Sequence, residues 1–276
     1  MCFFVVTVIA LCYNEAIKIG GTDMRFENKR VAVTGAASGI GEAIALAFAR
    51  EGADVAFLDM NSEKVSELAK KQSTDCIAVG IDVSDKVSVC AAFNEIEKRY
   101  GGLDIFVNCA GISVIVPMLE CSEEIWDKTI DINLKGAFLC MQSAIPMMRE
   151  RGGSIICMSS QSGKVGASQY QAYCASKFGV IGLVQSAALE FACEGIRVNA
   201  VCPGVVITPM WEKQTESYAK KRGMSPEEVM PYFKSKIPMG RLGELDDVVK
   251  AVFFLASDES SYLTGQSINV AGGQIM

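Results

Sequence analysis

Short runs of β-branched and other apolar residues alternate along the chain with longer stretches whose apolar positions recur every three to four residues. The short runs predict strands that are buried on both faces, and the longer stretches predict amphipathic helices. The predicted strands lie at residues 30–34, 54–59, 76–81, 104–108, 154–159, 197–202 and 267–270. The predicted helices lie at residues 40–51, 62–71, 86–100, 122–149, 170–194 and 246–257.

Regular alternation of strands and helices predicts an α/β fold, a parallel sheet with helices on both faces. One segment departs from it. Residues 208–238 follow a strand but are rich in Lys, Glu, Met, Tyr and Trp and contain four prolines. We expect a small substrate lobe of two short helices here, since long insertions after strands often carry specificity.

The chain has 276 residues, half of them hydrophobic, and no linker-like segment, which predicts one domain over residues 24–276. Residues 1–11 are apolar but too short to span a bilayer and lack the basic start of a signal peptide. Met24 leads directly into the first strand. We therefore expect residues 1–23 to be a non-native extension from a start codon placed too early.

Composition excludes several functions. The net charge is −6 and the densest basic run, at residues 220–222, is short, so we expect no nucleic-acid partner. The chain contains no histidine, which excludes Ser-His-Asp hydrolysis and His-ligated metal centres. Eleven cysteines without C-x-x-C spacing predict free, mostly buried thiols in a reducing compartment. These features favour a soluble cytoplasmic protein without a metal or membrane partner.

The run TGAASGIG at residues 34–41 follows a strand and opens a helix. Gly35 would permit a tight turn, Gly39 would let the backbone approach a pyrophosphate, and Gly41 would let the helix pack closely. A helix N-terminus there offers free N–H groups and its dipole to phosphates. A plain loop is the alternative, because a glycine-rich turn alone is a weak signal.

Asp59 ends the second predicted strand. A carboxylate there accepts hydrogen bonds from the ribose hydroxyls of an adenosine and repels a 2′-phosphate. No Lys or Arg lies at residues 36–38, so NAD is favoured over NADP. Further residues at predicted strand ends could meet a dinucleotide or simply form turns: Asp82, Val83, Asn108, Ala110 and Gly111.

Tyr173 and Lys177 lie four residues apart on a predicted helix and so share one face. An ammonium about 4 Å from a phenol contributes roughly 4 kcal/mol at an effective dielectric of about 20. We expect this charge to lower the pKa of Tyr173 enough to make it a base for an alcohol proton. The spacing is common on helix surfaces, and the pair gains meaning only from its neighbours.

Two polar residues are candidates for these neighbours. Ser160 ends the strand before this helix and could donate to a substrate oxygen as charge develops. Asn133 lies among apolar residues within a predicted helix, where a buried amide must be hydrogen-bonded. A water relay to Lys177 or a local helix kink would satisfy it.

Together with YCASK at residues 173–177, NCAG at 108–111 and Pro203-Gly204-x-x-x-Thr208, these motifs resemble the short-chain dehydrogenase/reductase family from about Met24 to the C-terminus. The resemblance implies a single-domain, Rossmann-type doubly wound parallel sheet and a homotetramer or homodimer. It implies a catalytic set of Asn133, Ser160, Tyr173 and Lys177. It also implies cofactor contacts from the strand ends and from Ser38, Ile40, Pro203, Val206 and Thr208. Cys109 departs from the family pattern, which usually has a second asparagine there.

The C-terminal third is similar to polyol dehydrogenases of the sorbitol-6-phosphate 2-dehydrogenase type. This likeness implies an NAD-dependent oxidoreductase that converts a polyol or polyol phosphate to a ketone, as in sorbitol 6-phosphate to fructose 6-phosphate. Lys164 and the lobe cations could serve a phosphate, and Met210 and Trp211 could serve an apolar substrate. The alternatives are a 3-oxoacyl thioester or hydroxysteroid reductase and, in another class, a non-catalytic dinucleotide-sensing protein.

Overall fold

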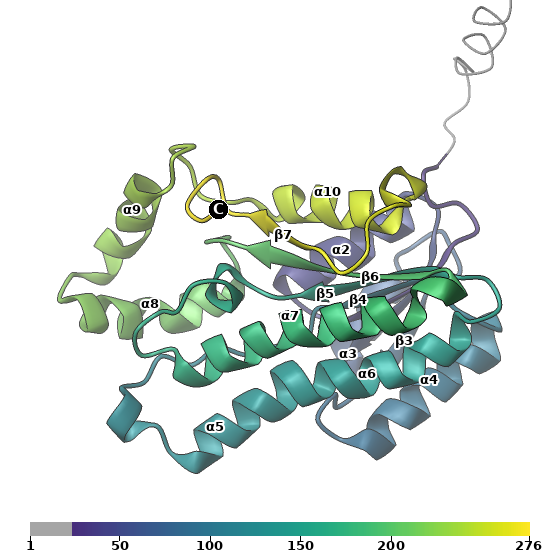
Figure 1. Ribbon diagram of the computed structural model, residues 1–276, viewed down its shortest axis with the longest axis horizontal. Coiled ribbons are helices and arrows are strands. Elements are labelled where there is room, and N and C mark those ends of the chain that lie inside the picture. Colours follow the sequence, from purple (N-terminus) through teal and green to yellow (C-terminus); the bar gives the residue numbers. More distant parts are fainter. Residues whose placement is uncertain (1–23) are drawn as a thin grey trace, which may run out of the picture.

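The computed structural model describes residues 24–276, so the predicted extension at residues 1–23 lies outside the described part. Seven parallel strands form one sheet in the order β3-β2-β1-β4-β5-β6-β7 (Figure 1). They are β1 (Arg30–Thr34), β2 (Asp54–Asp59), β3 (Ile77–Gly80), β4 (Ile105–Asn108), β5 (Gly153–Met158), β6 (Ile196–Pro203) and β7 (Ser267–Val270). Each predicted strand is present, with ends that agree within one residue. The predicted α/β fold is confirmed.

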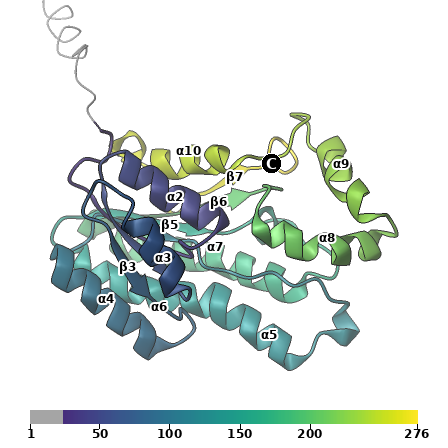
Figure 2. The ribbon, with the colours of Figure 1, turned by 180° about the vertical axis from the view of Figure 1, so that it is seen from behind.

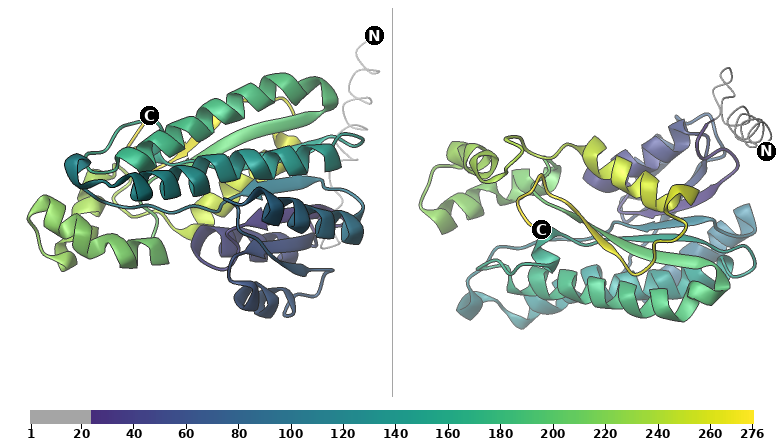
Figure 3. Two further views of the ribbon diagram at one scale, coloured as in Figure 1. Left: turned by 90° about the horizontal axis from the view of Figure 1, so that it is seen from below. Right: turned by 45° about the horizontal axis from the view of Figure 1, so that its top comes forward.

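Helices cover both faces of this sheet, as the views in Figures 2 and 3 show. One face carries α2 (Gly39–Arg50), α3 (Ser62–Ala69) and α10 (Leu245–Ala256). The other carries α4 (Lys86–Tyr100), α5 (Glu123–Ile130), α6 (Gly136–Ala144) and α7 (Gln171–Phe191). Short 3-10 turns lie at Met118–Glu120, Ile145–Met147, Gln161–Gly163, Ala192–Glu194 and Asp258–Ser260. The arrangement is the three-layer sandwich that a buried parallel sheet requires.

Alternate strand residues serve the two hydrophobic cores. In β1, Val31 and Val33 pack beneath α2 and α10, while Ala32 faces α4, α6 and α7. Phe106 of β4 joins the latter core, where its ring meets Phe93 of α4 edge-on at 5.5 Å between centroids. Successive residues of a strand point to opposite faces of the sheet, and both faces are covered by apolar helices. This explains why the strands are continuous apolar runs in the sequence.

The predicted single helix at residues 122–149 is wrong in one respect. Residues Asp131–Lys135 form a π-helical turn between α5 and α6, and the Ile145–Met147 turn ends the element. The π turn holds Asn133, whose side-chain amide hydrogen-bonds both polar groups of the Ile112 peptide unit in a neighbouring loop. A π turn contains one more residue than an α-helical turn. Hydrophobic periodicity does not reveal this insertion, because the apolar face continues on both sides of it.

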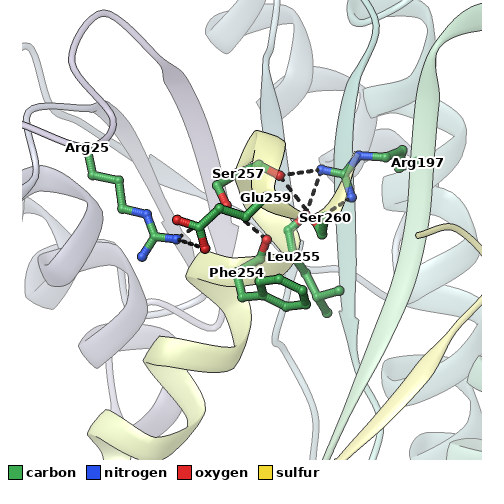
Figure 4. Close-up of polar contacts among 7 residues, drawn as sticks. All are labelled: Arg25, Arg197, Phe254, Leu255, Ser257, Glu259 and Ser260. Carbon is green, nitrogen blue, oxygen red and sulfur yellow. Dashed lines mark hydrogen bonds and ion pairs between the residues drawn. The ribbon is translucent and has the colours of Figure 1, made fainter. Parts of the chain in front are cut away.

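Polar contacts tie the end of α10 to two distant parts of the chain (Figure 4). Arg197 of β6 donates to the carbonyl oxygens of Leu255 and Ser257, which lie where the helix ends and have no N–H partner further along it. Arg25 forms an ion pair with Glu259 at 3.0 Å. Both arginines therefore fasten α10 at the edge of the sheet opposite the glycine-rich turn.

The segment after β6 forms two helices, α8 (Pro209–Arg222) and α9 (Pro226–Lys236), which lie beyond the carboxyl ends of the strands (Figure 1). A capping box at Ser225 and Glu228 starts α9. Trp211, Tyr218 and Phe233 pack their rings at 4.7–5.9 Å between centroids and give the lobe its own small core. Two helices are thus found where the sequence predicts a substrate lobe.

Among the described residues, one stretch, Gln171–Glu194, is long and apolar enough to cross a membrane by length and composition alone. It is α7 with its following turn. Val180 and Val184 of this helix belong to the core between α7 and the sheet. Its apolar character therefore has a packing explanation.

Candidate active site

A cavity of about 590 Å³ runs along the carboxyl edge of the sheet and beneath the lobe. Most of the residues that the sequence singles out line it. They are Gly35, Ser38, Gly39, Ile40, Gly41, Asp59, Asp82, Val83, Ala110, Gly111, Ser160, Tyr173, Lys177, Pro203, Val206 and Thr208. Asn108 and Asn133 lie outside its wall. The volume is in the range of small-molecule and cofactor sites.

The glycine-rich turn needs its glycines for two different reasons. Gly35 has a φ of +71°, a backbone conformation that residues with a Cβ rarely adopt. A Cβ on Gly41 would lie 2.2 Å from the carbonyl oxygen of Gly35. The first turn of α2 can therefore fold back over the end of β1 only with glycine at position 41, and this brings the free N–H groups of the helix to the cavity.

Thr34 joins this turn to the loop after β4. Its hydroxyl oxygen accepts from the backbone N–H groups of Cys109 and Ala110 at 3.0 and 3.2 Å. The hydroxyl itself donates to Oδ1 of Asn108 at 3.3 Å. Asn108 is buried and accepts this bond from Thr34, so its side chain supports the turn, and its predicted contact with a cofactor stays a prediction. Cys109 lines the cavity instead, and burial raises the pKa of its thiol to about 12, which makes it a poor nucleophile.

Asp59 lies at the far end of the cavity, where β2 ends. Its carboxylate accepts from the backbone N–H of Ala37 at 3.1 Å and from that of Asn61 at 3.0 Å. These two bonds orient the carboxylate beside the glycine-rich turn. Asp82, at the end of β3, instead accepts from the backbone N–H and the hydroxyl of Ser84, at 2.9 and 2.6 Å.

Ser160, Tyr173 and Lys177 meet in the middle of the cavity. Ser160 directly follows Ser159 at the end of β5, while Tyr173 and Lys177 occupy successive turns of α7. The ammonium of Lys177 donates to the carbonyl oxygen of Met158 at 2.8 Å and lies 5.8 Å from the centroid of the Tyr173 ring. One strand end and one helix therefore bring a hydroxyl, a phenol and an ammonium to a single site.

The expected lowering of the Tyr173 pKa by Lys177 is not what the structure shows. Burial raises the pKa of Tyr173, and the hydrogen bond with Ser160 opposes that rise. Burial also lowers the pKa of Lys177, whose only hydrogen-bond partner among residues 24–276 is the carbonyl oxygen of Met158. Burial therefore dominates the pKa of Tyr173, and Ser160 is the neighbour that opposes the rise.

Asn133 links the loop after β4 to helix α7 next to the site. Its Oδ1 accepts from the backbone N–H of Ile112, and its Nδ2 donates to the Ile112 carbonyl, both at 2.8 Å. Nδ2 also donates to Oγ of Ser176 at 3.0 Å. A Cβ on Gly111 would lie 3.2 Å from Asn133 Oδ1 and 3.4 Å from Lys177 Nζ, so the two side chains converge on that glycine. The π turn thus places the Asn133 side chain close to the Lys177 ammonium.

Further cavity residues come from the lobe and from the loop before α7, and of these the sequence indicated Met210, Trp211, Lys221 and Arg222 as candidate substrate contacts. Gln214 donates to the carbonyl oxygen of Ser113 at 2.8 Å and so ties α8 to the loop after β4. The other members of this wall are Gly166, Ala167, Ser168, Tyr170, Met210, Trp211, Tyr218, Lys221, Arg222 and Phe233. Only the unusual composition of residues 208–238 signalled that region.

Comparison with known proteins agrees with this geometry. A family model described as enoyl-(acyl carrier protein) reductase matches residues 35–274, nearly the whole described chain. The chain belongs to the short-chain dehydrogenase/reductase family. It is accordingly an enzyme that acts on CH–OH groups or the corresponding ketones with a nicotinamide dinucleotide. The predicted family and enzyme class are confirmed.

Its relatives in this family act on different substrates. The 3-oxoacyl-(acyl-carrier-protein) reductase of Thermotoga maritima is 40% identical over 257 residues, covering 92% of this chain and 100% of the relative. Galactitol 2-dehydrogenase of Agrobacterium fabrum is 40% identical over 255 residues, with the same coverage of both chains. The structure of sorbitol-6-phosphate 2-dehydrogenase from Erwinia amylovora superposes with a TM-score of 0.86 at 35% identity, covering 90% of this chain and 99% of that one.

The residues present fit the dinucleotide that the family uses. Gly41 clears the space in which α2 begins beside the cavity, and Asp59 presents an oriented carboxylate at the far end of the same cavity. Between them lie the backbone of the loop after β4 and the Lys177 ammonium. Phosphates, ribose hydroxyls and a nicotinamide each find a group of suitable chemistry there.

Proposed function

We propose that this enzyme is an NAD-dependent dehydrogenase that interconverts a secondary alcohol and a ketone in a polyol or polyol phosphate, of the sorbitol 6-phosphate to fructose 6-phosphate type. The observation that carries the proposal is the meeting of Ser160, Tyr173 and Lys177 in one cavity with the glycine-rich turn and a polar, cationic lobe wall. A soluble, cytoplasmic enzyme is part of the proposal.

In this mechanism Tyr173 takes the proton of the substrate hydroxyl as the carbonyl forms. Ser160 stabilises the phenolate of Tyr173 before substrate binds, and its single hydroxyl proton is donated to the substrate oxygen in the complex. Bound NAD supplies the acceptor for the hydride that leaves the carbinol carbon. Lys177 holds the nicotinamide ribose through its ammonium, and Asn133 positions the loop and helix that surround Lys177.

Two features support NAD over NADP. The carboxylate of Asp59 would repel a 2′-phosphate at the point where the adenosine ribose lies. The cations that line the described cavity are Lys177, Lys221 and Arg222, which belong to the catalytic helix and the lobe rather than to the Asp59 end. A 2′-phosphate would therefore meet a negative charge without a compensating positive one.

A second candidate is a 3-oxoacyl thioester or hydroxysteroid reductase of the same family. The similarity to the Thermotoga maritima reductase, equal to that of the galactitol dehydrogenase, favours keeping it. So do the apolar side chains of Met210, Trp211 and Phe233 on the lobe wall.

A substrate panel tests the proposal and separates these candidates. Purified enzyme would be assayed by NADH absorbance with sorbitol, galactitol, sorbitol 6-phosphate and the matching ketoses, and with acetoacetyl thioesters and hydroxysteroids, each with NAD(H) and NADP(H). We expect the highest kcat/KM with a polyol or its phosphate and NAD. Turnover confined to a thioester or steroid would overturn the polyol assignment.

We also propose that the enzyme assembles as a homotetramer or homodimer through the outer face of α5, α6 and α7. Trp126, Phe138, Phe178 and Leu189 on these helices are between 40% and 86% exposed. Large apolar side chains gathered on neighbouring helices are typical of subunit interfaces. Light scattering of the purified enzyme would contradict this part of the proposal if it gave the mass of one chain.

A further inference from the structure

Two adjacent cations, Lys221 and Arg222, lie at the C-terminal end of α8 and line the lobe side of the catalytic cavity. Lys221 is partly buried, whereas its neighbour Lys220 is exposed and lies outside the cavity wall. The lobe therefore turns one lysine of a basic run toward the site and leaves the other in solvent.

Aromatic rings and one carbonyl surround the Lys221 ammonium. Its Nζ lies 4.7 Å from the ring centroid of Tyr170 and 5.3 Å from that of Tyr218. It donates to the carbonyl oxygen of Ser168 at 2.5 Å. Arg222 stacks over Tyr218 and Tyr232 and donates to the Tyr218 hydroxyl at 3.3 Å. These contacts hold both cations in place at the edge of the cavity.

Neither cation is neutralised by the described part of the chain. No ion pair between residues 24 and 276 includes Lys221 or Arg222. Burial lowers the pKa of Lys221, and the charge of Arg222 lowers it further. Two like charges held side by side, one of them partly desolvated, favour a negatively charged ligand that would relieve both costs.

The distance from the catalytic tyrosine suits a sugar-length substrate. The ring of Tyr170 lies 6.0 Å from that of Tyr173 and 4.7 Å from Lys221 Nζ, so Nζ lies within about 10.7 Å of the Tyr173 ring. Six covalent bonds of about 1.5 Å, from the reacting carbon of a hexitol to a terminal phosphorus, span roughly 7 Å in zigzag form. Since 10.7 Å is the greatest separation that these contacts allow, Lys221 lies within reach of the terminal phosphate of a six-carbon substrate held at Tyr173.

Two glutamine side chains in the cavity wall carry buried oxygens that could accept hydrogen bonds. Oε1 of Gln161 and Oε1 of Gln274 are buried and have no hydrogen-bond donor among the described residues, and both glutamines line the cavity. Gln161 directly follows Ser160. Buried amide oxygens of this kind call for donors from a ligand, and hydroxyl groups along a carbon chain supply them.

We propose that Lys221, assisted by Arg222, binds the phosphate monoester of a polyol or ketose substrate, while Gln161 and Gln274 accept hydrogen bonds from its hydroxyl groups. This inference rests on the proposed function and narrows it to phosphorylated substrates. Lys221 is then a specificity-determining residue of the lobe. A phosphate at this distance fixes which carbinol carbon lies beside Tyr173.

A purely structural role for Lys221 is the competing explanation, since its bond to Ser168 ties α8 to the loop before α7. The two roles differ in their effect on substrate choice. A tether affects every substrate alike, whereas a phosphate-binding lysine affects only the substrate that carries the phosphate.

The test compares Lys221→Met with wild type in the reduction of fructose 6-phosphate and of fructose by NADH. Lys220→Met is the matched control, because it removes the same charge from the exposed neighbouring position. We expect Lys221→Met to raise KM for fructose 6-phosphate by about ten- to a hundredfold, the usual loss for a charge-assisted hydrogen bond. kcat, KM for fructose and the behaviour of Lys220→Met should stay close to wild type, and Lys221→Arg should recover most of the lost affinity.

Calorimetric titration of fructose 6-phosphate into the enzyme with NAD⁺, which cannot reduce a ketose, gives a second readout that does not need turnover. Tight binding that Lys221→Met weakens, without turnover of any polyol or ketose, would support the phosphate site and overturn the proposed function. Equal wild-type KM values for fructose and fructose 6-phosphate would keep the proposed function and overturn this inference. An equal loss for both substrates in Lys221→Met would also overturn it in favour of the tether.

Discussion

The two ends of the catalytic cavity are built in different ways. At the Asp59 end, the wall consists of turns that directly follow β1, β2 and β4, and hydrogen bonds from Thr34 and Asp59 to backbone N–H groups fix their shape. At the lobe end, the wall consists of side chains on α8 and α9 that pack around Trp211 and Phe233. The first end is defined by backbone and the second by side chains.

The two ends of the cavity also carry opposite charges. The Asp59 end presents a carboxylate, while the lobe end presents Lys221 and Arg222. A backbone-lined site recognises features that every dinucleotide has, and it tolerates little change in sequence. A side-chain-lined site on an inserted segment can change its substrate without disturbing the sheet. The comparison suggests that cofactor affinity and substrate affinity can be altered separately in this enzyme.

Removing the phenolic hydroxyl of Tyr173 should have the largest effect, because this residue lies where the two ends meet. Tyr173→Phe should lower kcat by about 10²–10⁴-fold through loss of acid–base catalysis. Steady-state assays would measure the loss, and fluorescence titration with NADH would measure cofactor binding, which should stay near wild type. Turnover close to wild type would refute the mechanism, and a matching loss of NADH affinity would show that the two ends are not separable.

Ser160→Ala should come next, with kcat about 10²–10³-fold lower because a donor to the developing oxyanion is lost. The pH profile carries further information. The proposed mechanism uses the phenolate of Tyr173 for alcohol oxidation, so the rate should fall as the pH drops through the Tyr173 pKa. Since the Ser160 hydrogen bond opposes the burial that raises this pKa, Ser160→Ala should move the acidic limb of the profile to higher pH. An acidic limb at the wild-type pH would show that Ser160 does not influence the ionisation of Tyr173.

Gly41→Ala tests the backbone-defined end alone. The new Cβ would overlap the Gly35 carbonyl, and relieving that overlap should cost roughly 1–3 kcal/mol in stability or NADH affinity. Gly182→Ala on α7 is the control, because a Cβ at Gly182 meets nothing within 4 Å. Thermal unfolding and NADH titration would measure both variants. An effect of Gly41→Ala on ketone KM but not on NADH affinity would contradict the division of the cavity.

Asp59→Ala should have the smallest effect, a reduction of about tenfold in the preference for NAD over NADP, as expected for a lost charge-assisted interaction. Glu63→Ala, an exposed carboxylate in the first turn of α3, controls for the change in net charge. The ratio of kcat/KM with the two cofactors is the measurement. A ratio that stays at the wild-type value would remove Asp59 from cofactor selection.

Sequence patterns predicted the strands within one residue and the glycine-rich turn and strand ends that line the cavity, because both depend on local signals. Buried strands need apolar runs, and the turn at residues 34–41 needs glycines where a Cβ would clash. Sequence patterns did not predict local structure that depends on a hydrogen bond to a residue distant in the sequence. The π turn at Asn133 follows from its bonds to Ile112, and the supporting position of Asn108 follows from Thr34.

The parallel sheet, the family resemblance and the glycine-rich side of the cavity could be predicted without a structure, since periodicity and glycine spacing are properties of the chain. Only the tertiary structure decided how the residues of the site behave. Burial, which no linear pattern measures, raises the pKa of Tyr173 against the expected effect of Lys177. The fold of the lobe likewise decided which lysine of the run at residues 220–222 reaches the cavity, because packing on Tyr170 and Tyr218 selects Lys221 over Lys220.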